Sequence, residues 1–132
     1  MKIISLYLFL FLFSANSYSC GFFTGLFTTE NVSIDYVGKI NFGEFKKTKS
    51  LTQIPITFTG GKWLQNSGIA FKKVIANVSN FEINITIQTC LASSGSQNKD
   101  QSIIVSKLLS GKYKVNYVNP DDSVVYIGEV KI

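Results

Sequence analysis

The stretch that most constrains the fold is residues 81–89, where apolar and polar side chains alternate without interruption. Successive side chains of a β-strand point to opposite faces of a sheet, so this pattern predicts a strand with one face on a core and the other in water. Five side chains share the core-facing side: Phe81, Ile83, Ile85, Ile87 and Thr89.

Shorter stretches of the same period recur along the chain. Residues 54–59 alternate in this way and predict a strand. Pro55 places this strand at a sheet edge or a bulge, because proline donates no ladder hydrogen bond. Residues 69–78 fit either a helix or a strand with a phase slip at Lys72 and Lys73, and their β-branched surroundings favour a strand. Together the segments predict an all-β fold, a single antiparallel β-sandwich of about seven strands. The further segments are 32–36, 39–42, 102–109, 112–117 and 124–132.

The first 19 residues are organised like a secretory signal peptide. Lys2 precedes an apolar run over 3–13, and Ser17 and Ser19 supply the small residues of a cleavage site before Cys20. Eleven helical residues span about 17 Å, less than the roughly 30 Å of a bilayer core. We therefore expect residues 20–132 to form one secreted or periplasmic domain without a transmembrane segment. Acylation of Cys20 is the less favoured alternative, because lipoprotein signals carry leucine where Ser17 stands.

Two cysteines, Cys20 and Cys90, remain in the expected mature chain. An even count in an oxidising compartment favours a disulfide bond. Closing a loop of about 70 residues would stabilise the fold by on the order of 4 kcal/mol in the chain-entropy model. The alternative is a buried free thiol at one position and a terminal one at the other. The apolar segment 21–27 between them predicts an edge strand or core plug, or an arm that binds a partner subunit.

Composition removes several chemistries. The chain has no histidine, and all thirteen basic residues are lysines. The usual general base and the commonest metal ligand are therefore missing. Asp121 and Asp122 are the only adjacent acids, and they stand in a turn where backbone bonding explains them. We expect no enzymatic activity, no cofactor and no metal. Nucleic acid is also excluded as a partner, because the compartment is wrong and arginine is absent.

The C-terminal hairpin carries a resemblance to a known superfold. Leu109, Gly111 and Tyr113 at the start of the strand over 112–117 resemble the tyrosine corner of immunoglobulin-like and fibronectin type III-like β-sandwiches. The resemblance covers about 25 residues and implies a fold rather than a function. It implies that the Tyr113 hydroxyl bonds to backbone just upstream, whereas the hydroxyl of mid-strand Tyr117 is expected to point to solvent.

These observations predict a non-enzymatic binding or accessory module that acts through a strand edge or an end loop. Its expected partner is another protein or a cell-surface component. The alternative is a small carrier with an apolar, lipid-like ligand between its sheets, since secreted lipid-recognition sandwiches resemble this chain in size and in the Gly-x-Tyr hairpin. Those proteins usually carry a cysteine in the final strand, where this chain has Tyr126 and Ile127. Twelve lysines and eight acids in the mature chain also allow weak attraction to an anionic membrane or cell wall.

Overall fold

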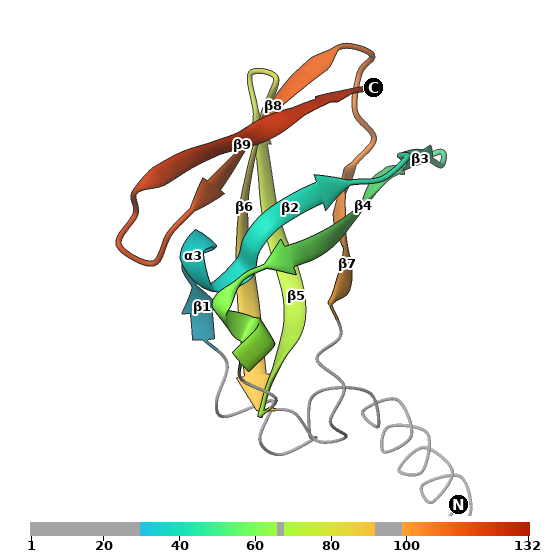
Figure 1. The fold of residues 1–132 in the computed structure, drawn as a ribbon. Helices are drawn as coiled ribbons and strands as arrows, with labels where there is room; N and C mark the ends of the chain where they lie inside the picture. Colours follow the sequence, from blue (N-terminus) through green and yellow to red (C-terminus); the bar gives the residue numbers. More distant parts are fainter. Residues whose placement is uncertain (1–29, 66–67, 92–98) are drawn as a thin grey trace, which may run out of the picture.

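Two packed β-sheets form the protein in a computed structural model that describes residues 30–65, 68–91 and 99–132 (Figure 1). The predicted signal peptide, Cys20 and the apolar segment 21–27 lie outside these residues. The described elements are β1 (Glu30–Val32), α3 (Ile34–Val37), β2 (Gly38–Phe42), β3 (Lys46–Lys47), β4 (Leu51–Gly60), η1 (Lys62–Gln65), β5 (Ile69–Ser79), β6 (Glu82–Leu91), β7 (Asp100–Ser106), β8 (Lys112–Val118) and β9 (Val124–Lys131).

Strand β6 is the centre of the first sheet, which contains β1, β5, β6, β8 and β9. It pairs with β5 along one edge and with β1 and β8 along the other, and β9 pairs with β8. The pairing of β6 with β8 is parallel, so the sandwich is not wholly antiparallel as predicted from the sequence. The reason is the crossover: β7 lies in the second sheet, and β8 returns beside β6 in the same direction.

Strand β4 is the centre of the second sheet, with β2 and β3 along one edge and β7 along the other. The interruption between β2 and β3 faces Pro55. There the Gly43 N–H donates to the Pro55 carbonyl oxygen at 2.7 Å. Because proline has no N–H to offer on that edge, the ladder breaks beside it. Pro55 thus lies at an irregularity of a central strand rather than at a sheet edge.

Alternating side chains of both sheets fill the space between them. Ile83, Ile85, Ile87 and Thr89 of β6 are buried, as the alternation over 81–89 predicts. The same prediction is wrong for Phe81, which lies in the turn before β6 and is 51% exposed. An aromatic cluster closes one end of this core: the Phe71 ring lies 4.6 Å from Phe58 and 5.7 Å from Trp63, centroid to centroid. Further buried members are Val37, Ile40, Ile54, Ile56, Ile103, Val105, Leu108, Tyr113, Val115 and Tyr117.

The phase slip in residues 69–78 is present and the segment is a strand. The register between β5 and β6 shifts between Phe71 and Lys73, which leaves Lys72 as an extra residue. Such a bulge lets Phe71 and Val74 both face the core although they are three residues apart. The apparent helical spacing of these apolar residues is therefore the signature of a bulged strand.

Two sequence expectations about local structure are wrong. The predicted strand over 32–36 ends at Val32, because the Tyr36 and Val37 N–H groups both bond to the Ser33 carbonyl and close a helical turn. In β9, a bulge at Ile127 reverses the alternation. Val124 and Tyr126 consequently lie exposed on the outer face, opposite to Val130.

Candidate functional site

One end of the sandwich gathers three connections and the end of β9, and we call it the basic end. The connections are residues 48–50, 80–81 and 107–111, which lie near the C-terminus in the upper part of Figure 1. Backbone hydrogen bonds join them. The Lys107 N–H donates to the Ser50 carbonyl oxygen at 3.0 Å, and the Lys114 N–H donates to the Phe81 carbonyl oxygen at 3.0 Å. Gly111 and Ile132 exchange two backbone hydrogen bonds, of 3.1 and 2.8 Å. The basic end is therefore a connected surface rather than a set of separate loops.

The connection over 107–111 is fixed by the tyrosine-corner residues. The Tyr113 ring is 4% exposed, and its hydroxyl donates to the Leu109 carbonyl oxygen at 2.9 Å. The neighbouring Leu108 is buried, and its N–H donates to the Thr52 hydroxyl at 2.9 Å. Leu109 is held between these two anchors, yet its side chain is 75% exposed. The loop thus presents an apolar side chain to solvent from a fixed backbone.

The turn over 80–81 has backbone dihedral angles that are unfavourable for a bulky residue. Asn80 has φ 49° and Phe81 has φ 60°, a pair of left-handed residues typical of a tight hairpin turn. Glycine is preferred at the second position, and a bulky residue there costs of order 1 kcal/mol or more. The Phe81 ring lies 5.1 Å from the Tyr113 ring, and 51% of Phe81 stays exposed. Half of the ring is thus packed on Tyr113, and the other half faces solvent.

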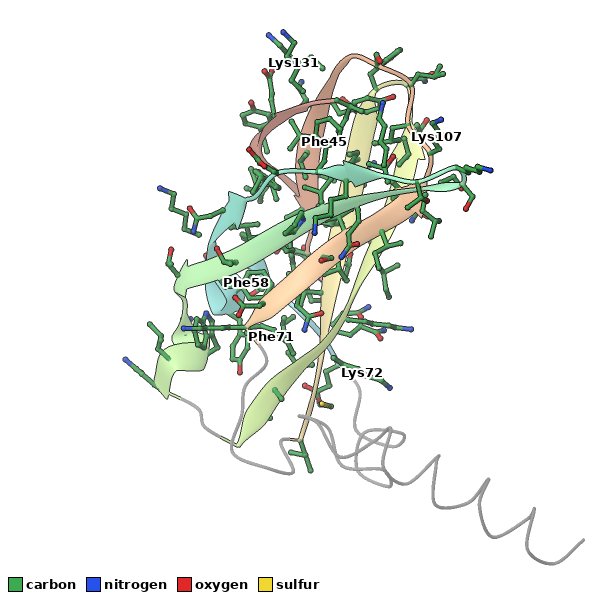
Figure 2. The ribbon with its side chains drawn as sticks, turned by 90° about the vertical axis from the view of Figure 1, so that its right-hand side faces the viewer. Phe45, Phe58, Phe71, Lys72, Lys107 and Lys131 are labelled. Carbon is green, nitrogen blue, oxygen red and sulfur yellow. The ribbon has the colours of Figure 1, made fainter. Side chains whose placement is uncertain are left out.

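Charge is distributed unequally between the two halves of the described structure. The strand registers place seven lysines and three glutamates in the half that contains the basic end, and five lysines and five acids in the other half. Figure 2 shows Lys107, Lys131 and Phe45 in the upper half of the molecule, with Lys72 in the lower half. The lysines of the basic half are Lys46, Lys47, Lys49, Lys107, Lys112, Lys114 and Lys131, and its acids are Glu44, Glu82 and Glu129.

Few of the basic-half lysines are neutralised by close contact with a carboxylate. Lys112 lies 3.9 Å from Glu129, and both side chains are exposed. Such a surface pair contributes little to stability. Lys47 lies over the Phe45 ring at 5.8 Å, which positions the ammonium group without cancelling its charge. The excess positive charge of this half is therefore available to an outside partner.

Two open grooves flank the basic end, one at each seam between the sheets. The first, of about 510 Å³, lies between residues 76–78 of β5 and residues 104–108 around the end of β7. The second, of about 400 Å³, lies between residues 42–45 and residues 129–131 of β9. The interior between the sheets is occupied by the buried core side chains. These grooves are therefore surface features at the seams rather than a chamber between the sheets.

Cys90 lies near the end of β6 and is 1% exposed, with its Sγ atom 3.7 Å from the Ala70 carbonyl oxygen. Its predicted partner, Cys20, lies outside the described residues, so the disulfide bond stays a prediction.

We expect thiol alkylation of freshly secreted protein without reductant to leave Cys20 and Cys90 unlabelled. Burial alone would protect Cys90 in the native state, so the labelling is done in denaturant, where only a covalent bond protects both thiols. After reduction, both should react. Labelling of both cysteines before reduction would contradict the pairing.

The prediction that the Tyr117 hydroxyl points to solvent is wrong. Its side chain is fully buried, its hydroxyl donates to the Val32 carbonyl oxygen, and the same oxygen accepts from the Ile87 N–H at 3.3 Å. The reason is that β1 covers only the last part of β6, so the Tyr117 hydroxyl occupies the gap in the ladder between β1 and β8. Burial raises the pKa of Tyr117 to about 12, although the bond to Ile87 acts in the opposite direction.

The sequence pattern identified only part of the basic end. Lys46, Lys47 and Lys49 form a visible cluster in the sequence, whereas Lys107 and Lys131 join them only through the strand order. Within 30–65, 68–91 and 99–132, no group of three or more metal-ligating side chains could hold an ion. None of the helical turns described there has the length and apolarity to cross a bilayer.

The chain matches no protein-family model, no curated protein and no solved structure.

Proposed function

We propose that the mature chain is a secreted or periplasmic binding module without enzymatic activity, and that it binds an anionic partner at the cell surface through the basic end. The observation that carries this proposal is the separation of charge. The basic half has four more lysines than acids among its side chains, while the other half is balanced. The whole net positive charge of residues 30–132 is thus concentrated at one end.

Concentrated lysines at one end would orient the molecule in the field of an anionic surface. Attraction of this kind acts over about 8–10 Å at physiological salt and weakens as salt rises. Lysine is a point charge without the planar fork with which arginine binds carboxylates and phosphates in a fixed geometry. An all-lysine surface therefore fits a partner with many distributed negative charges better than a single anionic ligand.

The finer fold assignment is part of the same proposal. We assign the sandwich to the immunoglobulin-like class, nearest to fibronectin type III-like domains. The contact between the Tyr113 hydroxyl and the Leu109 carbonyl supports it, because it is the contact that a tyrosine corner makes. The parallel pairing of β6 with β8 departs from a purely antiparallel sandwich.

Two triple variants with equal net charge test whether the binding surface lies at the basic end. Changing Lys46, Lys47 and Lys49 to glutamine removes three charges from the basic half, in β3 and the connection that follows it. The control changes Lys39, Lys62 and Lys99 to glutamine in the balanced half. We expect the first variant to elute from an immobilised soluble polyanion, dextran sulfate, at clearly lower salt than the wild type. The control should elute close to the wild type. Equal shifts for both variants would show that only net charge matters and would contradict a binding end.

A further inference from the structure

We propose that the anionic partner is a phospholipid surface, and that Leu109, Phe81 and Phe45 enter its interfacial region while the surrounding lysines contact the headgroups. This inference rests on the proposed function for the basic end and names the class of partner. It is carried by exposed apolar side chains that lie among the lysines: Leu109 and Phe81 on the connections of this end, and Phe45 on the segment between β2 and β3.

These apolar side chains are exposed on fixed backbone. The Leu109 carbonyl is held by Tyr113, and the adjacent Lys107 N–H and Leu108 N–H are both hydrogen-bonded to the start of β4 and the turn before it. A loop with this many anchors could carry a polar residue at position 109 at no cost in packing. Among the residues that the structure describes, Leu109 is the most exposed large apolar side chain, at 75%, and it is available for a contact outside the chain.

Phe81 gives an independent observation of the same kind. The turn needs φ of 60° at this position, where glycine would be free of strain, and half of the phenylalanine remains exposed. Gly111 accommodates the ring: a Cβ atom at Gly111 would lie 2.9 Å from Phe81 Cε1. The chain therefore maintains an aromatic residue at the tip of a turn where local backbone energetics disfavour it.

The combination of charge and apolar side chains favours a lipid surface over a soluble polyanion. A polyanion would be bound by the lysines alone, and exposed leucine and phenylalanine would add nothing. At a bilayer, apolar side chains enter the boundary between headgroups and acyl chains, and lysines contact anionic headgroups with their long aliphatic stems along the apolar surface. Phe45, with Lys47 above its ring and Lys131 in the adjoining groove, has this arrangement.

The test measures partition of the purified secreted protein onto vesicles of phosphatidylcholine with and without phosphatidylglycerol. We expect binding only where phosphatidylglycerol is present, with a steep loss on raising salt. Changing Lys46, Lys47 and Lys49 to glutamine should lower the partition coefficient about 100-fold, because each lysine near such a surface contributes about 1 kcal/mol.

The decisive variant is Leu109→Ser with Phe45→Ser. It should lower vesicle partition at least about tenfold, the cost of losing the burial of large apolar side chains, while its elution from dextran sulfate stays as in the wild type. Leu64→Ser is the matched control, since Leu64 is 60% exposed on η1 at the opposite end. It should leave both measurements unchanged.

The outcomes separate the two proposals. Retention on dextran sulfate without partition onto phosphatidylglycerol vesicles would overturn the lipid surface and leave the anionic binding end in place. An equal loss of vesicle binding for Leu64→Ser and for the double serine variant would also overturn it. If the lysine variant changed neither measurement relative to its charge-matched control, the proposed function would fall together with this inference.

Discussion

Replacing Tyr117 by phenylalanine is expected to lower the free energy of unfolding by about 3 kcal/mol, which corresponds to a fall in melting temperature of roughly 10 °C. The phenylalanine ring fills the same buried space, so packing is retained. The lost hydroxyl leaves the Val32 carbonyl and the Ile87 N–H without the group that bridges them, in addition to the direct pairing of β1 with β6. Each buried polar group left unpaired costs about 1–3 kcal/mol.

Two other tyrosines provide matched controls for this change. Tyr113→Phe removes one contact, with the Leu109 carbonyl, and should cost about 1–2 kcal/mol. Tyr36→Phe removes a buried hydroxyl that has no hydrogen-bond partner among the described residues, so it should leave stability unchanged or slightly raised. Denaturant unfolding of the three variants checks the order. A loss for Tyr117→Phe no larger than that for Tyr36→Phe would contradict the bridging role of the Tyr117 hydroxyl.

The same hydroxyl makes stability depend on alkaline pH. Burial raises the pKa of Tyr117 from 10.0 to about 12, so the folded state favours the neutral phenol. The stability that the neutral Tyr117 hydroxyl contributes is therefore fully present below pH 10, and it is lost as the pH rises from 10 to 12. Burial also raises the pKa of Tyr36, which adds a loss in the same direction. In the Tyr117→Phe variant, the decline in stability over this range should be visibly shallower than in the wild type.

Local alternation predicted the strands well, because the side-chain period of a strand is a property of the nearby sequence. It failed where the backbone changes phase. Residues 34–37 have the spacing of a strand, yet one turn of helix forms because the Ser33 carbonyl accepts two N–H groups. The bulge at Ile127 likewise moves Tyr126 to the outer face. Neither event leaves a signal in the apolar pattern alone.

The contacts of the Tyr117 hydroxyl and the location of the basic end could not be predicted from the sequence for a different reason. Both depend on which strands become neighbours, and strand order is a long-range property of the chain. Tyr117 reaches Val32 across 85 positions of sequence. Lys107 comes to lie beside residues 48–50 only because β7 pairs with β4. The tyrosine corner, in contrast, joins two residues only four positions apart, so its residues could be named from the sequence.

Replacing Gly61 by alanine is expected to lower the free energy of unfolding by more than about 4 kcal/mol or to prevent folding. A Cβ atom at this position would overlap the backbone carbonyl oxygens of Tyr36 and Val37, where α3 meets η1. Neither oxygen can move freely. The Val37 carbonyl accepts the Trp63 indole N–H at 2.9 Å, and Val37 itself is fully buried. Relief of the overlap would separate α3 from η1 and displace Trp63 from the aromatic cluster.

The neighbouring glycine is the control, because it has the opposite properties. A Cβ atom at Gly60 would meet nothing within 4 Å, but its φ of 72° is unfavourable for alanine. Gly60→Ala should therefore cost only about 1 kcal/mol, the penalty for a left-handed residue with a side chain. Soluble yield and thermal melting of the two variants distinguish overlap from backbone strain. If Gly61→Ala melted as close to the wild type as Gly60→Ala does, the expected overlap with the Tyr36 and Val37 carbonyl oxygens would be contradicted.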